Sequence, residues 1–424
     1  MVVVSERADR SGAPDRPGPW RRIGPGLLVA ATGVGAGDLA TSAFTGSALG
    51  VAVLWAVVVG AVFKFTLNEG LARWQLVTGE TLLEGVMRRV PRPLRFAFLV
   101  YLLPWTWIVG SALMGACGAT AHALFGGFED PATGKVVWGV VHSLAGLALV
   151  LVGGFRLFER LMGVAVGVMF VTVVATAIAL APDWAAVGNG LVVPRIPDAD
   201  GAGLGWTIAL MGGVGGTLTV LCYGYWIREE GRDGPSDIGA CRLDLGVGYA
   251  MTAIFGIAMV VIGSTVVVEG RGAGLIVALG DRLRDDLGPV ARNAFLVGAW
   301  AAVFSSLVGV WQAVPYLFAD FWRLAVERRP APVVGSLTRT RSYRFYLFAL
   351  AFAPMAGLAI DFRSVQQIYA IVGAAFMPLL AVALLLLNGR FGPLGAHRDR
   401  VLATVVLLGT LAFFAYQGVN ALAP

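Results

Sequence analysis

Apolar runs of about 20 residues recur along almost the whole chain, and they limit what it can fold into. A helix needs about 20 residues to cross the roughly 30 Å hydrocarbon core of a bilayer. The chain is 57% hydrophobic and only 14% charged, with a mean hydropathy of +0.77, unlike a soluble domain. Because the bilayer core contains no water to satisfy backbone groups, such spans are helical. We therefore predict an all-α polytopic membrane protein.

The hydropathy pattern predicts about eleven transmembrane helices. They cover residues 27–49, 51–71, 96–125, 136–152, 157–181, 206–226, 243–268, 290–318, 345–360, 365–387 and 401–419. Residues 1–22 are polar and rich in Gly, Pro and charge, so we expect a disordered cytoplasmic tail. The rest, 23–424, is predicted to be a single transmembrane domain. The first apolar run is too long for the core of a cleaved signal peptide, and we expect it to be an uncleaved anchor.

The positive charges predict the orientation in the membrane. Most of the 32 basic residues fall in alternate loops, for example around Arg21, Arg88 and Arg341. Cytoplasmic loops carry this excess of Arg and Lys, so we place the N-terminus in the cytoplasm and the C-terminus outside the bacterial inner membrane. The arginine-rich loop 323–344 is expected to contact anionic membrane lipids. Topology thus explains the net charge of +6, and nucleic-acid binding has no support.

Two of the predicted spans are interrupted by glycines at corresponding places in the two halves of the chain. The first contains Gly33 and Gly35 and a single carboxylate, Asp38, while the sixth contains Gly213 and Gly216. Backbone groups freed by unwinding inside a bilayer need protein, water or a ligand as partners. Paired interruptions of this kind indicate the midplane binding site of a secondary transporter.

Several stretches resemble the Nramp metal transporters. They are GPGLLVA and LATS at the first break, LARWQLVTGETLLEG after the second span, PDWAAVGNGLVVPRIP after the fifth and FSSLVGVWQ in the eighth. The resemblance runs from residue 24 to the C-terminus. It implies a LeuT-like fold with broken helices 1 and 6, inverted five-helix repeats at about 24–181 and 204–388, and an extra helix at about 400–420.

The resemblance fails at the family's metal-binding motifs. The family's metal-binding Asp and Asn fall on Gly35 and Asp38, and its Met-Pro-His pattern falls on glycine, threonine and leucine at 216–218. The family's proton-carrying acidic positions fall near Gly110 and Leu113. A thioether ligand for soft metals is therefore absent from the motif.

Missing side chains at the two breaks predict a roomy site that contains one carboxylate. A small dehydrated divalent ion needs several converging oxygen ligands, whereas a larger cation needs room, a carboxylate and aromatic faces. We therefore expect a small organic cation, guanidinium-like or resembling protonated creatinine. The predicted substrate-binding residues are Gly33, Gly35, Asp38, Gly213, Gly216, Thr217, Tyr223, Trp226 and Phe376. As alternatives, Asp38 caps a helix, the glycines serve helix packing, and the aromatic residues belong to the core or the interface.

The second span carries the ionisable residues Lys64, Glu69 and Arg73. Glu69 and Arg73 are four residues apart, so they can pair along one helical face. One interpretation is a structural ion pair. The other is that these residues couple protons to transport in a symporter, with Glu69 titrating.

Two other functions stay open. A divalent metal transporter for Mg2+ or Mn2+ would use Asp38 and backbone carbonyls, and a non-transporting membrane sensor is a possibility from another class. An enzyme is not predicted, because the spans contain no HExxH or G-x-S-x-G motif and no paired Asp or Glu at catalytic spacing. The sequence also has no P-loop motif, so ATP-driven pumping has no support. We expect no cofactor and no metal site built from the scattered histidines and cysteines.

Overall fold

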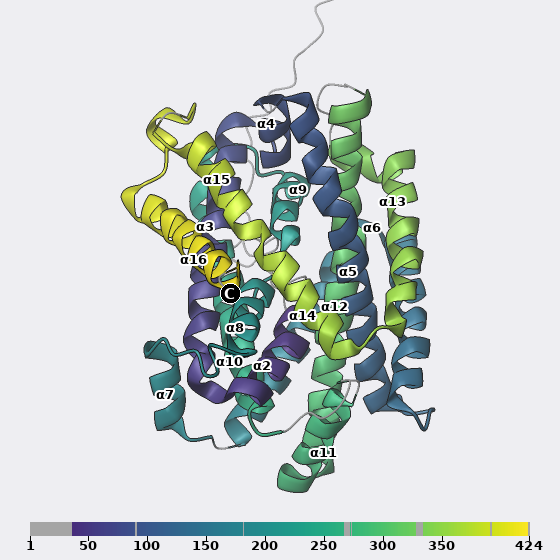
Figure 1. Ribbon diagram of the computed structural model, residues 1–424. Helices are drawn as coiled ribbons and strands as arrows, with labels where there is room; N and C mark the ends of the chain where they lie inside the picture. The colour runs from purple at the N-terminus through teal and green to yellow at the C-terminus, as the bar shows by residue number, and fades with distance from the viewer. Residues whose placement is uncertain are drawn as a thin grey trace, which may run out of the picture.

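The computed structural model is a bundle of helices (Figure 1). It describes residues 36–89, 91–180, 182–266, 272, 274–327, 334–390 and 392–422. All regular structure in these residues is helical, as predicted. The predicted tail 1–22 and the start of the first broken span, with Gly33 and Gly35, lie outside the described residues.

The first half of the chain forms a set of helices that matches the predicted spans closely but not everywhere. The elements are η2 (Ala36–Thr41), α2 (Ser42–Leu49), η3 (Gly50–Val53), α3 (Leu54–Thr78), α4 (Leu82–Arg89), α5 (Arg92–Phe125), α6 (Pro131–Ala179) and α7 (Trp184–Val192). Gly50, with φ of +66°, turns the chain from α2 toward α3. Helix α6 runs through the predicted fourth and fifth spans, where we expected a loop. No proline occurs between Pro131 and Pro182 to end the helix earlier.

The second half contains the interrupted sixth span. Its elements are α8 (Gly203–Gly213), η4 (Leu218–Cys222), α9 (Tyr223–Glu229), η5 (Pro235–Asp237), α10 (Ile238–Gly263), α11 (Leu275–Leu287), α12 (Pro289–Trp322), η6 (Arg323–Glu327), η7 (Val334–Arg339), α13 (Arg341–Phe352), η8 (Ala353–Ala359), α14 (Phe362–Ala374), α15 (Phe376–Asn388), η9 (Gly395–His397) and α16 (Val401–Leu422). The predicted tenth span is divided into α14 and α15. Pro378 is the third residue of α15 and has no N–H to bond the carbonyl of Ala374, four residues earlier, which explains why α14 ends there.

Seven helical stretches within the described residues are long and apolar enough to cross a membrane, or eight if one bent pair counts as a span. We predicted about eleven. The difference arises because α2 and α3 belong to one stretch and because α6 contains two predicted spans. In addition, α13 and the part Val401–Gln417 of α16 are shorter than a full span.

Apolar side chains cover both the inside and the outside of the bundle. Trp74, Trp105 and Trp206 are buried in its core, whereas Val152 and Leu386 are 87% and 71% exposed. A soluble protein rarely exposes apolar surface of this extent, and a lipid-facing surface does. In the interior, η2, α2, α3 and α14 pack against the interrupted helix α8. The break is therefore enclosed by elements from both halves of the chain.

Candidate cation site at the broken helix

The site begins where helix α8 stops. Its last helical hydrogen bond is donated by the Val214 amide to the Leu210 carbonyl. Gly215 and Gly216 follow with φ of +73° and +82°, a region that side chains disfavour. The break predicted from the glycines is therefore present, and it leaves the carbonyls at the end of α8 without helical partners.

Lys64 satisfies these carbonyls. Its side chain extends from α3, and the ammonium group donates hydrogen bonds to the carbonyl of Gly212, at 2.6 Å, and to those of Val214 and Gly216. An ammonium group has three donors, so all of them are used on the unwound segment. The Lys64 side chain is 1% exposed. The break thus already coordinates one positively charged group.

Asp38 lies on the other side of the same segment. Its Oδ2 accepts a hydrogen bond of 3.1 Å from the Gly215 amide, and the residue is fully buried on η2. The Asp38 carboxylate and the Lys64 ammonium attract each other. Asp38 Oδ1 has no hydrogen-bond partner in the described part of the chain. A buried carboxylate oxygen without a partner is costly, so this atom marks a position where a ligand would be stabilised.

The remaining predicted substrate residues have other partners. The Trp105 indole donates to Thr217 Oγ1 at 3.0 Å, next to the break. Tyr223 donates to Asp244 at 2.9 Å, and Trp226 donates to Gln312 at 3.2 Å. Phe376, at the start of α15, stacks on Tyr101 with ring centroids 5.6 Å apart. Gly213 is the last residue of α8. Of the predicted substrate-binding residues, Gly216 and Thr217 therefore lie within the unwound segment, and Asp38 contacts it through the Gly215 amide. Lys64 contacts the same segment through its carbonyls.

Glu69 and Arg73 pair as their spacing suggests, at 3.0 Å. Glu69 also binds Arg242 at 2.8 Å, and Arg73 binds Asp399 at 2.6 Å. The result is a cluster that connects α3 to α10 and to the segment before α16. Lys64 was predicted to act with these two residues, but its hydrogen bonds are made with the break instead.

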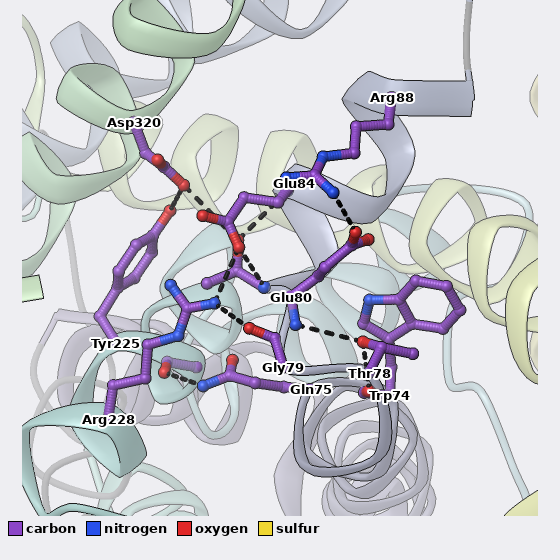
Figure 2. A network of polar contacts seen from close by, with 12 residues as sticks. Trp74, Gln75, Thr78, Gly79, Glu80, Glu84, Arg88, Tyr225, Arg228 and Asp320 are labelled. Carbon is purple, nitrogen blue, oxygen red and sulfur yellow. Dashed lines mark hydrogen bonds and ion pairs between the residues drawn. The ribbon is translucent and has the colours of Figure 1, made fainter. Parts of the chain in front are cut away.

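A second polar network, which sequence reasoning missed, surrounds Glu84 (Figure 2). The Glu84 carboxylate accepts from Arg228 at 2.8 Å and from Arg323 at 3.0 Å. It also accepts from the Thr81 amide at 2.7 Å, while Thr81 Oγ1 accepts from the Glu84 amide at 3.1 Å. This reciprocal pair is a capping box at the start of α4. Burial raises the pKa of Glu84, but the hydrogen bond and charge of Arg228, the Thr81 amide and Arg323 together hold it below its ordinary value.

The network reaches α9 and α12. Tyr225 donates to Asp320 at 2.8 Å, and Asp320 also binds Arg323. Gln75, at the end of α3, donates to the Gly224 carbonyl at 2.6 Å. By the predicted orientation these contacts lie toward the cytoplasm. They join the end of the interrupted sixth span to α4 and α12, on the far side of η4 from the break.

Side chains of the kinds that usually bind metals do not cluster in the described part of the chain. Within the residues that the structure describes, no three His, Cys, Asp or Glu side chains are placed to hold a metal ion together. A metal ion at the break would therefore rely on one carboxylate and on backbone carbonyls, which are hard oxygen donors.

Membrane helices, one of which is unwound beside a buried lysine and a buried aspartate, define this protein as a membrane transporter. The family model described as natural resistance-associated macrophage protein-like matches residues 26–423. The chain belongs to this family, Nramp, whose members are transporters and not enzymes. The expected membership and the LeuT-like fold are both confirmed.

Curated relatives and solved structures agree with this assignment. The divalent metal cation transporter MntH of Verminephrobacter eiseniae is 26% identical over 419 residues, 93% of this chain and 88% of that protein. MntH of Mycobacterium tuberculosis is 29% identical over 307 residues, 69% of this chain and 68% of that protein. A mutant of the Eremococcus coleocola manganese transporter has a similar fold, with a TM-score of 0.69, 17% identity and coverage of 97% and 89% of the two chains. MhsT in complex with L-phenylalanine is also similar, with a TM-score of 0.58, 19% identity and coverage of 91% and 95%.

Proposed function

We propose that the protein is a secondary active transporter that moves a divalent metal cation, Mg2+ or Mn2+, past the break of the sixth span. Family membership and the divalent metal transporters among the curated relatives support this cation class over the organic cation that the sequence alone favoured. The observation on which the proposal rests is the convergence of three carbonyls on one point beside Asp38.

The donor atoms suit a hard cation. Mg2+ and Mn2+ prefer carboxylate, carbonyl and water oxygens, whereas softer metals prefer thiolates and thioethers. Asp38 Oδ1 has no hydrogen-bond partner among the described residues, and the Asp38 carboxylate supplies the negative charge. The carbonyls of Gly212, Val214 and Gly216 supply neutral oxygens. A partly hydrated divalent ion could complete its coordination with water, as Mg2+ commonly does in proteins.

A small organic cation remains a second candidate because of one specific observation. The unwound segment already binds an alkylammonium group, that of Lys64, through three carbonyls. A guanidinium-like or creatininium-like molecule would present similar donors. The aromatic residues predicted to contact such a molecule, Tyr223 and Trp226, direct their polar atoms to Asp244 and Gln312.

We also propose that the protein lies in the bacterial inner membrane with a cytoplasmic N-terminus, and that a proton gradient drives transport. The pairing of Glu69 with both Arg73 and Arg242 supports a structural role for Glu69 and not a proton-carrying one. Glu69→Gln should then lower stability but leave the pH dependence of uptake unchanged.

The Asp38→Asn variant tests the cation site. In proteoliposomes with an imposed pH gradient, the unmutated protein should accumulate Mn2+. Asp38→Asn should reduce the initial rate at least about tenfold, because the site loses a negative charge that offsets the ion's desolvation. Asp285→Asn is the matched control, since the Asp285 side chain is 71% exposed on α11. Guanidinium is tested in the same vesicles. Uptake of guanidinium without Mn2+ uptake would favour the second candidate, and uptake of Mn2+ at an unchanged rate by Asp38→Asn would contradict the proposed site.

A further inference from the structure

We propose that the Lys64 ammonium is a tethered cation that occupies the substrate position in the substrate-free protein, and that the transported cation binds by displacing it. The identity of that cation rests on the proposed function. The role of Lys64 rests on the geometry of the break, where its three hydrogen bonds go to Gly212, Val214 and Gly216.

The carbonyls cannot serve Lys64 and a second cation together. All three point at the ammonium nitrogen, and the two positive charges would repel each other in a medium of low dielectric constant. An incoming ion that uses the same carbonyls must therefore move Lys64 away. Asp38 supports this order of events, because its Oδ1 has no partner among the described residues while the Lys64 donors are spent on the carbonyls. The carboxylate is thus available to the incoming ion before the lysine leaves.

The displaced ammonium has an acceptor within reach on its own helix. Asn68 follows Lys64 by four residues, so both side chains lie on the same face of α3. Asn68 is fully buried, and its amide nitrogen donates to the Tyr249 hydroxyl at 3.1 Å. Its Oδ1 has no hydrogen-bond partner in the described residues. The flexible four-carbon stem of lysine allows the ammonium to move from the carbonyls to this oxygen.

A tethered cation also neutralises the negative charge of the site in the substrate-free transporter. When the substrate leaves, Lys64 returns to the carbonyls and again offsets the charge of Asp38. The empty protein can then change conformation without exposing an uncompensated carboxylate to the membrane interior. A variant without the lysine should bind substrate more tightly, but it should return empty only slowly.

Calorimetry of Lys64→Met tests the displacement. Methionine matches the lysine side chain out to Cε and lacks its ammonium group, so Mn2+ should bind at least about tenfold more tightly than to the unmutated protein. The chain has a second lysine, Lys135, which donates to the Ile360 carbonyl at 2.9 Å and lies apart from the break, so Lys135→Met is the matched control. The affinity of Lys135→Met for Mn2+ should equal that of the unmutated protein. Equal or weaker Mn2+ binding by a folded Lys64→Met protein would show that Lys64 only supports the break.

Transport measurements also distinguish a lysine that replaces the cation from a lysine that only supports the break. Uptake of radioactive Mn2+ into vesicles without internal Mn2+ requires the empty carrier to return, whereas exchange with internal Mn2+ does not. Lys64→Met should lose at least about tenfold of the net uptake rate and keep the exchange rate. If both rates fall together, Lys64 is not a substitute for the cation.

A third measurement uses the unmutated protein and does not depend on how the variant folds. Lysine labelled with carbon-13 at Cε gives two signals, which the two methionine variants assign. Mg2+, a diamagnetic divalent ion of the proposed substrate class, should shift the Lys64 signal and leave that of Lys135 in place. A Lys64 signal that does not move at saturating Mg2+ overturns the displacement, although the proposed function stands. If neither the unmutated protein nor Lys64→Met binds Mn2+ or Mg2+, the proposed divalent substrate is itself wrong.

Discussion

Gly212 sets the distance between the broken helix and α14. A Cβ atom at this position would lie 2.4 Å from the Cβ of Ala374 and 2.5 Å from the carbonyl oxygen of Ala370. Real atoms do not approach so closely, so α8 would have to move away from α14. Because the Gly212 carbonyl is also an acceptor for Lys64, the same movement would displace part of the cation site.

We predict that Gly212→Ala lowers the thermal midpoint of the detergent-solubilised protein, since overpacking costs about 1–3 kcal/mol. Gly239→Ala in α10 is the control, because nothing lies within 4 Å of a Cβ there. It should leave the midpoint unchanged or raise it, since alanine is favoured over glycine in a helix by up to about 1 kcal/mol. Equal midpoints for the two variants would show that α8 and α14 are less tightly packed than described.

Single residues differ in how far their sequence environment reveals their role. Asp38 could be assigned to the site because it directly follows the glycine-rich interruption of the first span. The role of Lys64 could not be predicted, because its acceptors are backbone carbonyls 148 to 152 residues further along the chain, and carbonyls carry no sequence signature. The partners of Tyr223 and Trp226 were equally unpredictable, since Asp244 and Gln312 come from other helices.

At the scale of elements, the Glu84 network holds α4, α9 and the end of α12 together. Glu84 lies between Arg228 of α9 and Arg323 at the end of α12, so one carboxylate connects the interrupted span to its neighbour. The capping box from Thr81 to Glu84 could be read in the sequence as T-x-x-E. Its arginine partners could not, because they depend on how three helices pack.

We predict that Glu84→Gln loosens this end of the protein and exposes Cys222, which is buried in η4 between the network and the break. Losing the carboxylate leaves the buried Arg323 and the partly buried Arg228 without their shared counter-charge, and breaking a buried pair is strongly destabilising. The rate at which a small maleimide modifies Cys222 should rise at least about tenfold, as measured by mass spectrometry. Cys117 and Cys241 are buried internal references.

Glu80→Gln is the control for this experiment. Glu80 lies four residues before Glu84, but it pairs with Arg88 and Arg89 of α4, both partly exposed, and such pairs contribute little. The rate of Cys222 modification in Glu80→Gln should match that in the unmutated protein. A similar rise in both variants would indicate general loosening and would contradict a specific role for Glu84.

At the scale of the whole molecule, both halves of the chain are needed to build the site. Asp38 and Lys64 come from the first half, and the unwound segment comes from the second. Hydropathy predicted the helical class and most helix positions, because spans of about 20 apolar residues have few other solutions in a membrane. It did not predict the continuity of α6, because whether apolar helices join or separate depends on tertiary packing.

The orientation in the membrane follows from the positions of the arginines and stays a prediction. With an odd number of spans, about eleven, the two ends should lie on opposite sides. A periplasmically active alkaline phosphatase fused after Pro424 should therefore be active, and a fusion within the arginine-rich segment near residue 90 should be inactive. Activity at both fusion points, or at neither, would contradict the predicted topology.

The contact between Lys64 and the second half has a consequence for biosynthesis. At about 5–20 residues per second, the ribosome completes the acceptors of Lys64 roughly 7–30 s after the lysine itself. During that interval an ammonium at bilayer depth would cost about 2.5–3.5 kcal/mol. Helix α3 is therefore not expected to insert fully into lipid on its own. It should stay at the insertion machinery, or keep its lysine among the lipid headgroups, until the glycine-rich segment that accepts the lysine's hydrogen bonds has been synthesised.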